Sequence, residues 1–307
     1  MGLIASLSPR GRSGFGASST AEQVTAGVDL TGKTFLLTGC NAGIGRETLR
    51  VLHRRGARVL AAARTVAKAQ EAIDACAPGA VPLACELSEP ASVRACVDAV
   101  TRDGAPLAGI IANAGIMALP TLTVRHGLEL QFLTNHIGHF MLITGLLDRL
   151  ADDGRVVVVS STAHRRAPAE GIDFDNLAGQ RSYAPWAAYG RSKLANLLFT
   201  RELARRLAGS RRTANAIHPG VIATQLTRNM GKAVGVLWGA MSPLLLKSIP
   251  QGAATQCYVA CHPAVATVSG EYFKDCNVTR SSARGADLAL AARLWAESER
   301  IVATLSS

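Results

Sequence analysis

A tyrosine and a lysine four residues apart, Tyr189 and Lys193, lie in a stretch with the helical spacing of apolar residues. Residues four apart share one helix face, so both side chains are expected to reach the same space. A free tyrosine has a pKa of about 10, and a nearby ammonium group favours the phenolate. The pair could therefore serve as a general acid and base near working pH. Because this spacing is common in helices, the interpretation needs support from other residues.

Two polar positions upstream provide that support. Residues 155–160 predict a buried strand that leads into Ser161, whose hydroxyl could hydrogen-bond a substrate carbonyl oxygen. Asn135 falls within an otherwise apolar helical stretch, where an amide without partners is costly. We therefore expect Asn135 to bind either a water molecule or a backbone carbonyl group.

A glycine-rich turn follows the first predicted strand. Its three glycines come after an apolar run at residues 34–38 and before a helical pattern over 46–55. At this spacing the backbone can approach a pyrophosphate, whose charge meets the free amides of the helix N-terminus. Taken alone, the motif could also be a purely structural turn. The predicted dinucleotide contacts are Gly39, Asn41, Gly43, Ile44 and Gly45.

Arg64 follows the second predicted strand, where an NAD-selective protein usually offers an acid to the ribose hydroxyls. Its planar guanidinium can pair with a 2′-phosphate, so we predict NADP(H) in preference to NAD(H). An ordinary surface arginine at a strand end is the alternative. Further cofactor contacts are predicted after the third and fourth strands, at Glu86, Leu87, Asn113, Ala114 and Gly115.

The elements that position these residues alternate along the chain. Short apolar strands are predicted at 34–38, 58–63, 81–84, 109–112, 155–160, 213–218 and 270–273. Helical patterns fall near 46–55, 66–76, 91–101, 127–150, 187–208, 250–262 and 286–299. The alternation predicts an α/β fold with one doubly wound, Rossmann-type parallel sheet of about seven strands and helices on both faces. Ligands of such sheets bind beyond the carboxyl ends of the strands.

The composition suits a globular chain of 307 residues with 18% charged residues. Residues 1–26, rich in Ser, Gly and Arg, predict a flexible or loosely docked basic arm before a single domain over 27–307. The net charge of +11 could indicate an acidic partner, but the arginines are dispersed and aromatic platforms are lacking, so no nucleic acid is expected. The seven cysteines and the histidines at 136, 139 and 164 lack zinc-site spacing, so we expect reduced thiols, packed histidines and no metal.

The sequence also favours certain locations. Neither a signal peptide nor a transmembrane helix is expected, so the protein is predicted to be neither secreted nor transmembrane. We expect it in the cytoplasm or, if the basic arm is a targeting segment, inside an organelle. Residues 1–6 also fit the loose pattern for N-myristoylation.

Several motifs together resemble the short-chain dehydrogenase/reductase (SDR) superfamily: TGCNAGIG, ANAG, TNHIGHF, VVSS, YGRSK and HPG, in this order. Within it, NHIGHF, SSTAH and IHPGVIATQL look most like the retinol dehydrogenase branch. The opening GFGASSTAEQVTAGVDLTGK and the late SGEYFKDCN are similar to chloroplast translocon-associated members and their bacterial relatives. The resemblance covers roughly residues 14–300.

This resemblance implies roles for individual residues. Tyr189 would exchange a proton with the substrate oxygen, and Ser161 would hydrogen-bond that oxygen. Lys193 would hold the nicotinamide ribose and lower the tyrosine pKa, while Asn135 would anchor a water in a proton relay. The nicotinamide would be lined by Pro219, Gly220, Val221 and Thr224. The sequence departs from the usual pattern of this family at two positions. Ala112 replaces the first asparagine of the common NNAG motif, and Glu86 replaces the aspartate that commonly follows the third strand.

Two segments are expected to shape the substrate site. Residues 162–188 would form one wall, and the apolar segment near 225–250 would form a lid, with or without a membrane or subunit contact. We expect NADP(H)-dependent interconversion of a carbonyl and an alcohol on a lipophilic substrate such as a retinoid, steroid or long-chain aldehyde or ketone. The alternative is an NADP(H)-binding sensor or scaffold that acts through protein partners. Helices near 127–150 and 187–208 resemble those that pair in SDR dimers, which suggests a homodimer.

Overall fold

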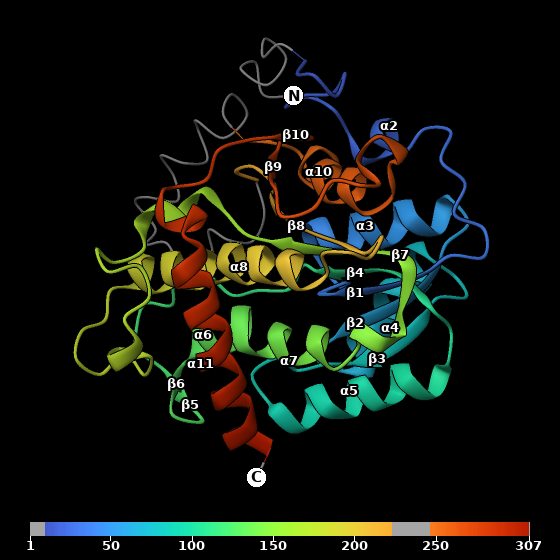
Figure 1. The fold of residues 1–307 in the computed structure, drawn as a ribbon. Coiled ribbons are helices and arrows are strands. Elements are labelled where there is room, and N and C mark those ends of the chain that lie inside the picture. Colours follow the sequence, from blue (N-terminus) through green and yellow to red (C-terminus); the bar gives the residue numbers. More distant parts are fainter. Residues whose placement is uncertain (1–9, 223–245, 307) are drawn as a thin grey trace, which may run out of the picture.

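A central sheet of eight strands runs through the computed structural model, which describes residues 10–222 and 246–306 (Figure 1). The strand order is β10-β9-β8-β7-β4-β1-β2-β3. The bounds are β1 Thr34–Thr38, β2 Arg58–Ala63, β3 Val81–Ala84, β4 Leu107–Ala112, β7 Leu150–Val159, β8 Thr213–His218, β9 Tyr272–Lys274 and β10 Asn277–Val278. All neighbouring pairs are parallel except β9 and β10, which are antiparallel. The predicted doubly wound α/β fold is confirmed.

Helices cover both faces of this sheet (Figure 1). One face packs against α2 (Ala21–Val24), α3 (Gly43–Arg54), α4 (Val66–Cys76) and α10 (Ile249–Cys261). The other packs against α5 (Pro90–Asp103), α7 (Gly138–Thr144), α8 (Pro185–Arg206) and α11 (Leu288–Ser306). Successive strand residues point to opposite faces, so Phe35 and Leu37 of β1 join the first core and Leu36 joins the second. Burial on both faces explains why the strands are apolar throughout.

The helix predicted near 127–150 is shorter and interrupted in the structure. A small hairpin precedes it, formed by β5 (Val124–Arg125) and β6 (Leu128–Glu129). The hairpin turns at His126 and Gly127, which both have positive φ, as a two-residue loop of this type requires. The helical part that follows consists of α6 (Leu130–Phe132), a π-helical turn η1 (Leu133–Ile137) and α7. Such π turns often occur at functional sites, and this one carries Asn135.

Residues 10–26, part of the predicted N-terminal arm, pack against the rest of the chain in the structure. The Phe15 ring packs edge-on against Tyr258 of α10, with 5.6 Å between ring centroids. Asn277 accepts a hydrogen bond from the Ser13 amide at 3.0 Å and donates one to the Phe15 carbonyl at 3.1 Å. Ala21 and Val24 of α2 are buried in the core beside α10. Apolar anchors and satisfied backbone groups offset the entropy of ordering this segment.

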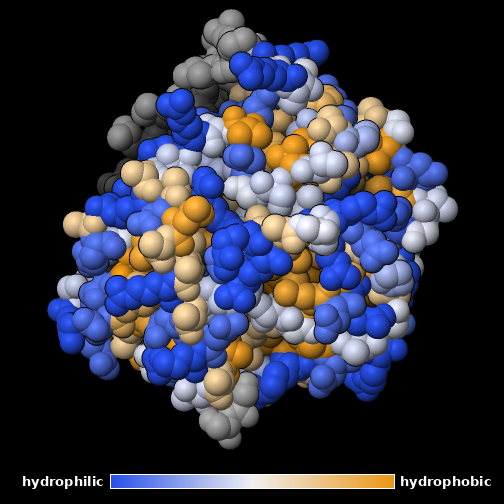
Figure 2. Space-filling view, in the orientation of Figure 1, coloured by the Kyte–Doolittle hydropathy of each residue, from blue (hydrophilic) through white to orange (hydrophobic). Residues whose placement is uncertain are grey.

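The segment predicted as a lid lies almost wholly outside the described residues, as does Thr224. On its two sides, Ile222 and Lys247 form a parallel bridge, and the Lys247 amide donates to the Val221 carbonyl at 2.8 Å. The end of the predicted lid is the first turn of α10, which Ser248 caps through the Gln251 amide. No described helix is both long and apolar enough to cross a membrane. On the face shown in Figure 2, the hydrophobic residues (orange) lie in separate groups between hydrophilic residues (blue).

Candidate active site

The predicted site residues gather at the carboxyl edge of the sheet, around the point where the strand order reverses between β1 and β4. Gly39 follows β1, Asn113 follows β4, Ser161 comes just after β7, and Pro219 follows β8. Tyr189 and Lys193 reach the same edge from α8, and Asn135 reaches it from the π turn, as the contacts below show.

The glycine turn has no room for a side chain at Gly39 or Gly45. Gly39 and Gly43 have φ of +70° and +53°, a conformation that favours glycine. A Cβ on Gly45 would lie 2.0 Å from the Gly39 carbonyl oxygen. Helix α3 begins at Gly43 with Ala42 as its N-cap, which provides no side-chain hydrogen bond, and its first turn has no acidic residue. The open helix N-terminus therefore suits an anion such as the pyrophosphate of a dinucleotide.

Thr38 and Asn113 fasten this turn to the end of β4. The Thr38 hydroxyl accepts the amides of Asn113 at 3.0 Å and Ala114 at 3.1 Å. In return, the Asn113 side-chain amide donates to the Thr38 carbonyl at 2.8 Å. The Asn113 Oδ1 atom is buried and has no partner among the described residues. This role of Thr38 was not predicted from the sequence. A hydroxyl side chain at the end of an apolar strand could have indicated it.

Ser161 and Tyr189 meet where α8 crosses the segment after β7. The Ser161 hydroxyl lies close enough to the Tyr189 phenol to act on its pKa. Ser161 also begins the 3-10 helix η3 (Thr162–Arg166) by accepting the Ala163 amide at 3.1 Å. Gly190 allows this approach, since a Cβ there would lie 2.7 Å from the Ala163 carbonyl oxygen. The glycine beside the tyrosine is therefore needed to bring Tyr189 to Ser161.

Asn135 is fully buried and uses its amide to hold protein groups. Its Oδ1 accepts the Ile116 amide and its Nδ2 donates to the Ile116 carbonyl, both at 2.9 Å. Nδ2 also donates to the Ser192 hydroxyl at 2.9 Å, and that hydroxyl donates to the Tyr189 carbonyl at 2.8 Å. Of the two predicted partners, the structure shows the backbone carbonyl. Asn135 thus connects the strand β4 side of the site to α8.

Residues 33–235 match the family model for short chain dehydrogenases. The chain belongs to this SDR family. It is 44% identical over 309 residues to "Short-chain dehydrogenase TIC 32 B, chloroplastic" from Brassica napus, covering 96% of both chains. It is 42% identical to retinol dehydrogenase 12 from Mus musculus, covering 88% of this chain and 86% of that protein.

Solved structures agree with the SDR fold. A putative uncharacterized protein from Mycobacterium paratuberculosis superimposes with a TM-score of 0.74 at 35% identity, over 93% of this SDR chain and 97% of that chain. A short chain dehydrogenase from Burkholderia cenocepacia J2315, crystallised with NADP, gives a TM-score of 0.61 over 80% and 96% of the chains. At 24% identity, the second likeness supports the fold alone.

Burial controls the charges at this SDR site. It raises the pKa of the Tyr189 phenol to about 12, although the hydrogen bond from Ser161 acts in the opposite direction. Burial also lowers the pKa of the Lys193 ammonium to about 8. Lys193 Nζ donates to the Val159 carbonyl at 2.9 Å and lies 5.7 Å from the Tyr189 ring centroid. Desolvation is thus the largest influence on the Tyr189 pKa, and the phenol is protonated at neutral pH. That Lys193 lowers the tyrosine pKa stays a prediction.

Other predicted contacts differ in how they face the site. Gly115 is exposed, and a Cβ there would lie 3.0 Å from Asn135 Oδ1 and 3.6 Å from Lys193 Nζ. Leu87 is buried in the core, where its carbonyl oxygen would lie 2.3 Å from a Cβ on Gly138. Glu86 accepts hydrogen bonds from the amide and hydroxyl of Ser88 at 3.3 and 2.9 Å. Leu87 and Glu86 thus shape the turn after β3, and their cofactor contacts stay predictions.

The described residues predicted to line the nicotinamide are more open. Gly220 has φ of +97°, and a Cβ there would lie 2.5 Å from Cδ of Lys247. Val221 is 53% exposed, which is unusual for a valine beside a buried strand. Pro219 is half-buried between β8 and this glycine.

Arg64, the residue predicted to contact a 2′-phosphate, is exposed at the end of β2. It lies directly before Thr65, the N-cap of α4.

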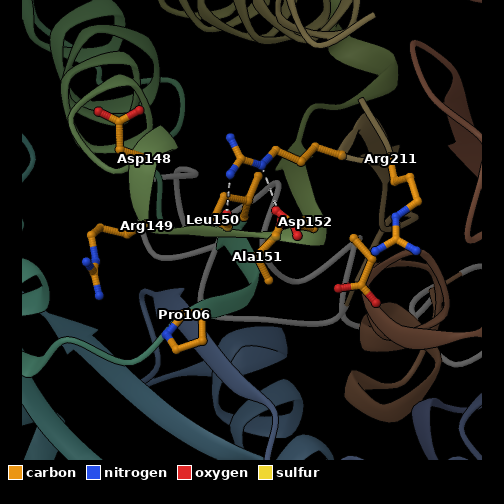
Figure 3. Close-up of a pocket in the computed structure, with 9 residues that line it drawn as sticks. Pro106, Asp148, Arg149, Leu150, Ala151, Asp152 and Arg211 are labelled. Atoms are coloured by element: carbon orange, nitrogen blue, oxygen red, sulfur yellow. Dashed lines mark hydrogen bonds between the residues drawn. The ribbon is translucent and has the colours of Figure 1, made fainter. Parts of the chain in front are cut away.

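A surface hollow of about 510 Å³ lies at the opposite edge of the sheet (Figure 3). It is lined by Pro106, which precedes β4, by the start of β7, and by Arg211 and Arg212, which precede β8. Arg212 donates to the carbonyls of Leu150 at 2.7 Å and Ala151 at 3.2 Å. Because ligands of parallel sheets bind at the carboxyl ends, this hollow is separate from the candidate active site.

Three buried histidines predict a marked sensitivity of the fold to acid. Burial lowers the pKa of His136 to about 3 and those of His139 and His218 to about 4. An unfolded histidine has a pKa of about 6.5. Between pH ~6.5 and pH ~4 these histidines are protonated in the unfolded chain but neutral in the folded one. Their contribution to the free energy of unfolding is therefore fully present above pH ~6.5 and decreases as the pH falls towards ~4. Each histidine contributes about 1.4 kcal/mol of loss per pH unit in this window.

Urea unfolding at pH 7 and pH 5 measures this effect. We expect a much smaller free energy of unfolding at pH 5, and a shallower pH dependence in His136→Leu, which lacks one of the three groups. Equal unfolding free energies of the wild type at the two pH values would contradict the prediction.

Proposed function

We propose that this SDR oxidoreductase uses NADP(H) to interconvert a carbonyl and an alcohol on a lipophilic substrate, with Tyr189 as acid and base. The observation that carries the proposal is the placement of Tyr189 and the buried Lys193 one turn apart on α8, with Ser161 beside the Tyr189 phenol. These groups lie at the same sheet edge as the glycine turn. Short-chain dehydrogenases act on alcohol and carbonyl groups with nicotinamide cofactors, and the family match therefore supports the assignment.

The glycine turn and the N-terminus of α3 would hold the pyrophosphate of the cofactor, which supplies or accepts the hydride when bound. In carbonyl reduction, Tyr189 donates its proton to the substrate oxygen, and Ser161 hydrogen-bonds that oxygen. Lys193 presents its ammonium group near the phenol, where its positive charge would stabilise the phenolate that remains after Tyr189 gives up its proton. Asn135 holds the backbone of Ile116 and the α8 residue Ser192 in register with the tyrosine.

Aromatic and aliphatic groups near Tyr189 support a lipophilic substrate. Trp186 is 38% exposed, and its ring lies 6.2 Å from the Tyr189 ring, edge to face. The Arg166 guanidinium covers this indole at 4.9 Å from the ring centroid. Val221 exposes its side chain after β8. These surfaces suit an apolar carbonyl compound, as does the similarity to a protein named retinol dehydrogenase.

Arg64→Ser is expected to reduce the preference for NADPH over NADH by about 10- to 100-fold. The reason is that a charge-assisted bond to the 2′-phosphate contributes roughly 1.5–3 kcal/mol, and 1.4 kcal/mol corresponds to tenfold in affinity. The measurement is the ratio of dissociation constants for the two cofactors. Arg102→Ser, which changes a surface arginine of α5, serves as control and should keep the ratio. An unchanged ratio in Arg64→Ser would remove the basis for NADP(H) preference.

The function is tested by following oxidation of NADPH and NADH by the purified protein across hydrophobic aldehydes and ketones. Turnover of long-chain or cyclic carbonyls with NADPH is expected. Tight NADPH binding without turnover of any carbonyl would favour the alternative of a sensor or scaffold that acts through protein partners. The homodimer and the peripheral membrane contact suggested by the sequence stay predictions.

A further inference from the structure

His139 on α7 lies between the two halves of the candidate site. Its ring is 1% exposed, and burial lowers its pKa to about 4, so the ring is neutral at physiological pH. Nδ1 lies 3.0 Å from the Asn135 carbonyl oxygen, and Nε2 lies 2.9 Å from the Thr38 hydroxyl. One neutral imidazole therefore contacts both the π turn and the end of β1.

The partners of this ring determine its tautomer. A carbonyl oxygen can only accept, so Nδ1 carries the proton and donates it to Asn135. Nε2 is then an acceptor and takes the proton of the Thr38 hydroxyl at 2.9 Å, in preference to the Ile111 carbonyl at 3.4 Å. The oxygen lone pairs of Thr38 are left for the amides of Asn113 and Ala114. All hydrogen-bond directions in this network are consistent.

The network joins the glycine turn to the catalytic helix. From Thr38, which fastens the turn, it passes through His139 to Asn135, whose amide binds Ser192 of α8. We propose that His139 is a positioning residue that aligns the cofactor-binding turn with Asn135 and, through it, with Tyr189. The inference rests on the proposed function for its catalytic part, while its cofactor-binding part can be measured without turnover.

Two conservative variants separate the two contacts. His139→Asn keeps a short amide that can donate to the Asn135 carbonyl, and His139→Gln keeps a longer amide whose oxygen can accept from Thr38. His139→Asn is expected to weaken NADPH binding more than it lowers kcat, and His139→Gln to do the reverse. His139→Leu removes both contacts and should lower kcat/KM about 100-fold, the loss typical of a displacement near 1 Å at a reacting group.

His136 provides a matched control from the same helical segment. It is equally buried, and its Nε2 lies 2.8 Å from the Ser298 hydroxyl of α11, away from the network. His136→Leu should lose stability while keeping the NADPH dissociation constant and kcat within about twofold of the wild type. NADPH binding by fluorescence titration, steady-state kinetics and urea unfolding are measured on all four variants.

The outcomes decide between positioning and simple packing. His139 is a positioning residue if His139→Asn weakens NADPH binding more than it lowers kcat and His139→Gln lowers kcat more than it weakens NADPH binding. If both behave like His136→Leu, losing stability alone, the proposal is overturned. A wild type that binds NADPH without turning over any carbonyl defeats the proposed function, and NADPH binding by His139→Asn then still tests the link to Thr38. These two polar variants also cover the case in which His139→Leu fails to fold.

Discussion

Tyr189→Phe is expected to lower kcat for NADPH-dependent carbonyl reduction by about 10²- to 10⁴-fold, the usual contribution of a positioned general acid. The substitution removes one oxygen and keeps the ring. Because the phenol is protonated at neutral pH, it is the group able to give a proton to the substrate oxygen beside Ser161. Steady-state kinetics at pH 7, together with NADPH titration, measure the effect. Binding of NADPH should change little, since the glycine turn is untouched.

Tyr258→Phe is the matched control for this change. Tyr258 is a buried tyrosine of α10 that packs against Phe15 on the other face of the sheet. Its loss of a hydroxyl should leave kcat close to the wild-type value. Near-normal turnover in Tyr189→Phe would show that the proton comes from elsewhere.

Gly45→Ala is expected to weaken NADPH binding about 100-fold. Its Cβ would lie 2.0 Å from the Gly39 carbonyl oxygen and 2.6 Å from Asn113 Nδ2, so the backbone of the turn has to move. The movement takes amides of the α3 N-terminus away from the pyrophosphate, and each charge-assisted hydrogen bond lost costs roughly 1.5–3 kcal/mol. Fluorescence titration with NADPH measures the loss, and thermal unfolding shows whether the variant is folded.

Gly79→Ala controls for the general cost of replacing a glycine. Gly79 has φ of +90° in the loop before β3, and an added Cβ would meet nothing within 4 Å. This variant should lose some stability through backbone strain and bind NADPH like the wild type. Equal binding by Gly45→Ala and the wild type would mean that the turn does not receive the cofactor.

Much of the fold was predictable from local pattern. The strand bounds 34–38, 58–63, 81–84 and 213–218 agree with the structure, because strands buried on both faces must be short, apolar runs. The helix predicted near 127–150 was less accurate. An apolar pattern alone does not reveal the turn at His126 and Gly127 or the π turn that contains Asn135.

The sequence by itself determined the SDR family, the doubly wound sheet and the residue types of the site, since these depend on spacing along the chain. The tertiary structure decided what each polar group meets. Burial, a property of the packed chain, raises the pKa of Tyr189 and lowers the pKa of Lys193. The spacing of the two residues along the chain does not predict this burial. Likewise, Thr38 and His139 come together from positions far apart in sequence, because β1 and α7 pack at the same edge of the sheet, and spacing carries no information about such contacts.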